Sequence, residues 1–414
     1  MKRLLLLIPT TTYRTEDFVE AAGRLGVEMI VASERPSTFE TEFPDHLLTV
    51  DFTDPEKAAR TVAELARRRP LDAVVPVDDV TTVVGAAIAD ALGLRANPVP
   101  AVATARNKYR MREALRRAGV AGPPYRLFTL GDDPATAARG VAYPCVLKPT
   151  ILAASRGVIR ADTEAEFVAA FRRIAAILET PDVAALGEGA DQILVEGFVP
   201  GREVALEGLL VEGRLHVLAL FDKPDPLDGP FFEETIYVTP SRLPADVQAA
   251  VGASAAEAAR ALGLREGPIH AELRVQETPP RAWLIEIAAR SIGGLCSRTL
   301  RFGTGLTLEE IILRHALRLD IASLERERQP AGVMMIPIPG RGVLEAVEGQ
   351  AAARAVPGIE EVVITAHVGQ ELVPLPEGSR YLGFIFARAD SPERVEAVLR
   401  AAHGRLAFVI ASLE

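Results

Sequence analysis

The sequence of 414 residues contains very little cysteine and lysine. Its two cysteines, Cys145 and Cys296, cannot cross-link a chain of this size, so a disulfide-stabilised scaffold is excluded. We expect both thiols to be reduced and buried, in a cytoplasmic protein. Only five of the 46 basic residues are lysines. Because arginine supplies most of the positive charge, we expect the few lysines to have roles that need a compact ammonium group.

Long hydrophobic runs are also missing, which argues against a membrane protein. No stretch reaches the roughly 18 apolar residues that a membrane-spanning helix needs. The N-terminal run Leu4–Ile8 ends at Pro9 and is shorter than the ~7–15 apolar residues of a signal peptide. We therefore expect a buried strand there. The net charge of -10 and the lack of a local basic patch argue against a nucleic-acid partner.

Two common nucleotide-binding signatures are absent. The first predicted strand is followed by Pro9–Tyr13 and not by G-x-G-x-x-G, so a dinucleotide fingerprint is excluded. No G-x-x-x-x-G-K-[ST] sequence occurs, so there is no Walker A loop. A nicotinamide-dependent enzyme is therefore a remote alternative.

The composition is otherwise that of a folded enzyme, with 49% hydrophobic and 25% charged residues. In residues 1–105, strands alternate with helices, which predicts a parallel sheet covered on both faces, as in half of a Rossmann domain. The expected strands are 4–8, 27–32, 46–50 and 72–77, and the expected helices are 16–25, 56–68 and 81–92.

Residues 106–325 show an α+β pattern, which we divide into lobes 106–190 and 191–325. The first lobe is expected to contain a helix at 108–118, a strand at 143–148 and a helix at 163–179, whose Thr163 and Glu166 form a capping box. The second lobe is mostly antiparallel. A polar linker at 325–329 then leads to a β-rich α+β unit, 326–414, for which a cap over the site would fit.

The most informative feature is a pair of glutamates on a predicted hairpin. A turn centred on Pro279 pairs Glu272 in strand 269–275 with Glu286 in strand 282–288, on one face. Facing like charges destabilise a sheet, and a carboxylate among apolar residues is costly unless paired. A bound Mg²⁺ would remove both costs. The alternative is that one glutamate faces solvent or pairs with Arg274 or Arg290, and we favour the metal.

Two lysines and one loop suggest phosphate binding. Lys148 ends a buried strand, and Lys108 opens a helix, where a positive charge opposes the helix dipole. The small residues of 151–157 would let a mobile backbone close over phosphates, although most such stretches are plain loops.

Three further features are ambiguous in isolation. Pro200-Gly201 interrupts the strands around 194–203, which either frees backbone groups for a flat heterocycle or makes a simple turn. Lys223 lies in an acidic loop that could recognise an amino group or be plain surface. Arg290, four residues after Glu286, could stabilise an oxyanion, although an ordinary strand-end arginine is the simpler interpretation.

Taken in order along residues 1–320, these motifs resemble the ATP-grasp superfamily. The resemblance implies a bound ATP and Mg²⁺, with Mn²⁺ as a substitute. It assigns ATP contacts to Lys108, Lys148, Ser155, Gly157, Glu196, Phe198, Val199 and Glu203, metal ligation to Glu272 and Glu286, and stabilisation of an acyl phosphate to Arg290. Many members carry an asparagine where this chain has Ala288, so the metal site differs in that ligand.

Within that superfamily, the segments 222–224, 234–240 and 286–290 are most similar to the L-amino-acid ligases. This resemblance implies substrate contacts from Lys223, Glu234, Tyr237, Arg290 and Gly293, with Tyr237 in the place of a histidine. The implied activity is an ATP-dependent carboxylate–amine ligase that works through an acyl phosphate, with small-molecule substrates and, by analogy, a homodimer. The alternatives are a biotin-carboxylase-like or purine-synthesis ligase, or a non-catalytic ATP-binding module.

Overall fold

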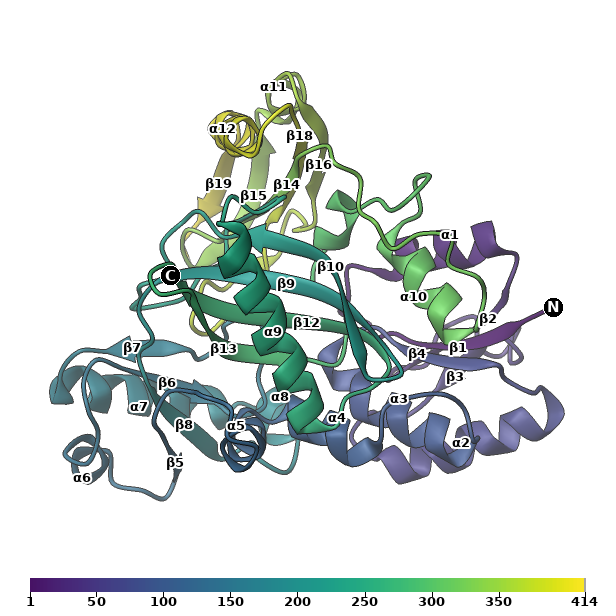
Figure 1. Cartoon of the computed structure of the whole chain (residues 1–414), viewed down its shortest axis with the longest axis horizontal. Coiled ribbons are helices and arrows are strands. Elements are labelled where there is room, and N and C mark those ends of the chain that lie inside the picture. Colours follow the sequence, from purple (N-terminus) through teal and green to yellow (C-terminus); the bar gives the residue numbers. More distant parts are fainter. Residues whose placement is uncertain (413–414) are drawn as a thin grey trace.

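The computed structural model describes residues 1–412 (Figure 1). Its N-terminal part is a four-stranded parallel sheet in the order β3-β2-β1-β4, flanked by helices, as the alternating pattern predicted. Leu4–Leu7 are fully buried, because both faces of the sheet are covered. The elements are β1 (Arg3–Leu7), α1 (Thr15–Leu25), β2 (Glu28–Ser33), β3 (Leu47–Thr49), α2 (Pro55–Arg68), β4 (Ala73–Pro76) and α3 (Asp79–Ala91).

A four-stranded antiparallel sheet in the order β5-β8-β6-β7 forms the next lobe, with α7 packed on it. Thr163 caps α7 by accepting a hydrogen bond from the Glu166 amide, as predicted. The predicted return hydrogen bond, from the Thr163 amide to the Glu166 carboxylate, is wrong, because that carboxylate accepts from the Asp162 amide. The elements are α4 (Val99–Arg106), α5 (Lys108–Arg117), β5 (Tyr125–Thr129), α6 (Pro134–Ala138), β6 (Cys145–Pro149), β7 (Ile159–Ala161), α7 (Glu164–Leu178), α8 (Pro181–Ala184) and β8 (Gln192–Gly197).

The largest sheet has eight strands in the order β13-β12-β9-β10-β11-β14-β18-β16. Helix α9 lies across β9, β12 and β13 and buries its apolar side there (Figure 1). The elements are β9 (Arg202–Val211), β10 (Arg214–Asp222), β11 (Ile236–Thr239), α9 (Ala245–Leu262), β12 (Gly267–Gln276), β13 (Arg281–Ala288), η1 (Cys296–Thr299), α10 (Leu308–Ala316) and β14 (Ala331–Ile336). Because β14 pairs with β11, the sheet continues past the predicted linker into the C-terminal unit.

The C-terminal unit adds a small sheet, β17-β15-β19, and two helices near β14, β16 and β18 (Figure 1). The sequence predicts strands at 333–338, 361–365, 381–388 and 406–411, and the structure has a strand at each place. It did not predict β15, β17, α11 or α12, and the buried face of α12 packs on β14 and β18. The elements are β15 (Gly342–Glu348), α11 (Gln350–Arg354), β16 (Ile359–Ile364), β17 (Glu371–Leu372), β18 (Gly383–Arg388), α12 (Pro392–His403) and β19 (Ala407–Ala411).

Two expectations from composition can be compared with the described residues. Cys145 and Cys296 are both buried and neither forms a disulfide. Within residues 1–412, no helix combines the length and apolar character needed to cross a bilayer.

Candidate active site

A cavity of about 1230 Å³ lies where the N-terminal part, both lobes and the C-terminal unit meet. The carboxyl ends of all four parallel strands contribute to its wall, which is where open α/β sheets bind ligands. Thirteen of the fifteen predicted site residues line it: Lys108, Lys148, Ser155, Glu196, Phe198, Val199, Glu203, Glu234, Tyr237, Glu272, Glu286, Arg290 and Gly293. Gly157 and Lys223 do not.

Glu272 and Glu286 are paired across β12 and β13, as predicted. The register predicted from a turn centred on Pro279 is wrong for the outer part of the hairpin. That part is shifted by one residue, with Val275 opposite Ala282. A β-bulge restores the glutamate pair: Leu273 lies opposite Leu284, so Ile285 is the extra residue. In the outer register Glu286 would lie opposite Ala271 and point to the other face. The bulge therefore brings both carboxylates to the cavity.

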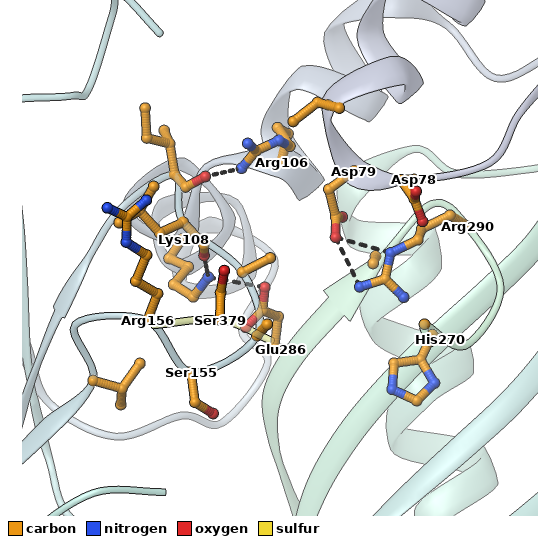
Figure 2. Close-up of a pocket in the computed structure, with 18 of the residues that line it drawn as sticks. Asp78, Asp79, Arg106, Lys108, Ser155, Arg156, His270, Glu286, Arg290 and Ser379 are labelled. Atoms are coloured by element: carbon orange, nitrogen blue, oxygen red, sulfur yellow. Dashed lines mark hydrogen bonds and ion pairs between the residues drawn. The ribbon is translucent and has the colours of Figure 1, made fainter. Parts of the chain in front are cut away.

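Both predicted ATP lysines are buried and ion-paired. The Lys108 ammonium donates to Glu286 Oε1 at 2.9 Å and to the Leu152 carbonyl at 2.6 Å (Figure 2). Lys148 lies 2.5 Å from Glu196 Oε2, and Arg112 contacts the same carboxylate. Burial alone would raise the pKa of Glu196, but the two cations outweigh it and lower that pKa to about 2.

Lys223 lies among three carboxylates behind the cavity wall. Its ammonium donates to Glu203 Oε1 at 2.8 Å, contacts Glu234, and lies 3.7 Å from Glu272 Oε1. Tyr237 donates its hydroxyl to Glu234 at 2.6 Å. Despite burial, these carboxylates raise the pKa of Lys223 well above its usual value. This ammonium group is thus held by the protein's own glutamates.

The donor set at Glu272 and Glu286 fits a hard divalent cation. Burial raises the pKa of Glu272, and the neighbouring charges of Glu203 and Glu286 raise it further, more than Lys223 and Arg290 offset. A bound cation would stabilise the ionised form of this buried carboxylate, and carboxylate oxygens are the ligands that Mg²⁺ prefers. Among the described residues, Glu203, Glu234 and Glu272 also lie close enough to share an ion. The Lys223 ammonium already lies among these three carboxylates.

Arg290 is held by a residue that sequence reasoning missed. Its Nε and Nη2 atoms both lie 2.8 Å from Asp79 Oδ2, at the start of α3 (Figure 2). Burial would raise the pKa of Asp79, but Arg290, helped by Arg106 and Lys108, brings it down to about 2. The Asp79 carboxylate thus ties the N-terminal part to the end of β13. Its position just after a parallel strand was the signal that could have revealed it.

The small-residue loop after Lys148 is held by the C-terminal unit. The Gly157 amide donates to the Pro376 carbonyl at 2.8 Å, and Arg156 Nε donates to the Glu377 carbonyl at 3.0 Å. Gly157 has φ +74°, and a Cβ there would lie 2.8 Å from the Pro149 ring, so only glycine fits. Ser379, Tyr381 and Met335 also line the cavity, consistent with the expected cap.

The remaining predicted positions lie at the cavity edge. The Phe198 ring packs under the guanidinium groups of Arg160 and Arg274, at 4.2 and 4.9 Å from its centroid. The Val199 carbonyl accepts from Arg274 at 3.1 Å, and Glu203 accepts from the same arginine at 3.0 Å. Arg274, which the sequence offered as a possible partner for one of the paired glutamates, instead pairs with Glu203 and organises this edge.

Comparison with known families gives three matches in chain order. Residues 19–95 match the ATP-grasp N-terminal domain, residues 141–299 the ATP-grasp domain, and residues 334–411 the L-amino acid ligase C-terminal domain 2. The chain belongs to the ATP-grasp superfamily. This membership agrees with the fold, in which the cavity lies between the two ATP-grasp lobes and the flanking units.

Similar proteins include a ligase and a synthase. The alanine–anticapsin ligase of Bacillus subtilis strain 168 is 28% identical over 290 residues, covering 66% of this chain and 60% of that protein. Chicken carnosine synthase 1 is 31% identical over 354 residues, 80% of this chain and 38% of that one. The chain thus spans about 60% of the length of the alanine–anticapsin ligases it matches.

Solved ATP-grasp structures match over the full chain. An L-amino acid ligase from Bacillus licheniformis superposes with a TM-score of 0.79 and 27% identity, covering 100% of this chain and 99% of that one. A carboxyaminoimidazole ribonucleotide synthetase from Thermotoga maritima has a TM-score of 0.71, with full coverage of both chains, at 17% identity. The second likeness shows the shared fold alone.

Proposed function

We propose that this ATP-grasp protein is an ATP-dependent carboxylate–amine ligase that joins two amino acids through an acyl phosphate and releases ADP and phosphate. The observation that carries the proposal is the placement of Glu272, Glu286 and Arg290 in one cavity with Lys108 and Lys148. The full-length likeness to an L-amino acid ligase and the similarity to alanine–anticapsin ligase and carnosine synthase support this substrate class.

The first step requires that the negative charge of the triphosphate be neutralised. Lys108 and Lys148 present buried ammonium groups to the cavity, and ATP would take over part of their present pairing with Glu286 and Glu196. Glu272 and Glu286 would hold Mg²⁺ or Mn²⁺, which supplies electrostatic stabilisation of the transferring phosphoryl group when bound. Phe198, Val199 and Glu203 would contact the nucleoside at the cavity edge.

In the second step an amine attacks the acyl phosphate carbonyl, and charge develops on its oxygen. Arg290 is fixed by Asp79 beside the glutamate pair, so its guanidinium can stabilise that oxyanion without reorganising. Ser155 and Gly157 belong to the loop that would cover the phosphates, and the contacts from Pro376 and Glu377 hold it in place. Exclusion of water protects the acyl phosphate from hydrolysis.

The first amino acid would bind on the side of Tyr237. Glu234 would accept a hydrogen bond from its ammonium group. Burial raises the pKa of Glu234, and Lys223 partly offsets that rise. Gly293 leaves space beside Arg290. This arrangement assigns Lys223 an indirect part in substrate binding, since its ammonium is buried behind the cavity.

The deciding experiment is an ADP-release assay over pairs of amino acids, with mass spectrometry of the products. A condensed dipeptide formed together with ADP supports the proposal. Release of ADP only with bicarbonate and biotin, or only with a ribonucleotide amine, would move the protein to the carboxylase or purine-synthesis ligases. Tight ATP binding without ADP release under any pair would indicate a non-catalytic module. Analytical ultracentrifugation of the same sample tests the proposed homodimer.

A further inference from the structure

The β-bulge that pairs the two glutamates is held from outside the hairpin. Arg112, on α5 one turn after Lys108, is almost completely buried at 2% exposure. Its Nη1 donates to the Leu284 carbonyl and its Nη2 to the Ile285 carbonyl, both at 2.8 Å. Leu284 and Ile285 are the residues at which β13 changes register. One guanidinium group therefore donates a hydrogen bond to each carbonyl of the bulge.

The same guanidinium also reaches the nucleotide side of the cavity. Arg112 Nε contacts Glu196 Oε1, and Nη2 lies 3.3 Å from Glu196 Oε2. Glu196 in turn holds Lys148. Every donating nitrogen of Arg112 is thus used, and the planar fork makes contacts that a lysine cannot reproduce.

The contacts of Arg112 favour the bulged register of β12 and β13 over the regular one. A bulge costs one ladder position, and the hairpin's outer register would otherwise extend to the glutamates. That regular alternative would turn Glu286 away from Glu272. Two charge-assisted hydrogen bonds from a buried arginine favour the bulged form, because only that form offers these carbonyls to α5.

We propose that Arg112 is a positioning residue that fixes the bulge at Leu284 and Ile285 and thereby sets Glu286 opposite Glu272 for metal binding. The inference rests on the proposed function only for the assignment of Glu286 as a metal ligand. Outer groups of this kind typically change metal affinity by about 10- to 100-fold when altered.

The test measures Mn²⁺ binding to the full chain in the presence of ADP, with electron paramagnetic resonance as the readout. The variant Arg112→Lys keeps a positive charge for Glu196 but loses the fork. We expect its Mn²⁺ affinity to fall about tenfold or more, while its ADP affinity in EDTA stays within twofold of the parent. Arg116→Lys, one turn further on the exposed side of α5, is the matched control and should leave both affinities unchanged.

Hydrogen exchange of residues 281–288 gives a readout that does not depend on ligands. We expect faster exchange there in Arg112→Lys and not in Arg116→Lys, with the circular dichroism spectrum preserved in both. Mn²⁺ affinity within twofold of the parent, or an equal loss of ADP binding in EDTA, would overturn the positioning role. If the parent itself binds no Mn²⁺ with ADP, both this inference and the metal assignment fail. If the parent binds Mn²⁺ and Arg112→Lys weakens that binding, but the parent forms no amide, only the proposed reaction fails.

Discussion

Asp79 Oδ2 lies 2.8 Å from both Nε and Nη2 of Arg290, although 211 residues separate them along the chain. The contact joins the first turn of α3 to the end of β13. Burial would lower the pKa of Arg290, but the Asp79 carboxylate outweighs it and raises that pKa. The N-terminal sheet is therefore part of the site, since it sets the direction of the guanidinium.

Asp79→Asn should lower kcat by about 10- to 100-fold, the size of effect expected when a charge-stabilising group is misplaced by about 1 Å. KM for ATP should change less than threefold, because Lys108 and Lys148 keep their positions. Steady-state kinetics of ADP release measures both constants. Asp79→Glu should recover part of kcat, and Asp90→Asn, exposed near the end of the same helix, should behave as the parent. Equal loss in Asp79→Glu would indicate a purely structural role.

Glu286→Gln should abolish turnover and leave the fold intact. The amide keeps the shape of the side chain and can still accept from Lys108, but it loses the charge that a divalent cation needs. ADP release and thermal unfolding, measured side by side, test this. Glu277→Gln at the tip of the same hairpin, where the glutamate pairs with exposed Arg202, is the control. Full activity in Glu286→Gln would end the metal assignment.

Acid should destabilise the protein partly through Glu196. Its pKa is about 2 in the folded protein against 4.5 ordinarily. The ionised form thus stabilises the fold fully above about pH 4.5, and this contribution disappears as the pH falls towards 2. Urea unfolding at pH 7, 5, 4 and 3 measures the effect.

Glu196→Gln should lose the part of the pH dependence that Glu196 contributes. At pH 7 its free energy of unfolding should be lower by about 3–5 kcal/mol, because Arg112 and Lys148 are left buried without a counter-ion. Glu64→Gln, on the exposed face of α2, should match the parent at every pH. An unchanged slope in Glu196→Gln would show that other carboxylates control acid unfolding.

Neither cysteine should react with iodoacetamide in the native protein at pH 8. Burial raises the pKa of Cys145 to about 12 and that of Cys296 above its ordinary value, so almost no thiolate is present. Mass spectrometry should find both alkylated only after unfolding in guanidinium. Rapid native labelling at Cys296, which lines the cavity, would show that the cavity opens more than the structure indicates.

The sequence by itself determined the local elements and the types of residue in the site. Apolar runs such as Leu4–Leu7 predict buried strands, since they have no other way to leave water, and the scarcity of lysine drew attention to Lys108 and Lys148. The spacing of Glu272 and Glu286 placed them on one hairpin. These features follow from short-range geometry, which is fixed by neighbouring residues.

Only the tertiary structure decided how those residues meet. The outer register of the hairpin, continued inward, would not pair the two glutamates, and the bulge at Ile285 that pairs them accepts a hydrogen bond from Arg112, 173 residues away. Asp79 reaches Arg290, and Lys223 reaches three glutamates, only after the sheets have assembled. The physical reason is that a buried charge is tolerated only beside its partner, and the fold alone brings distant partners together.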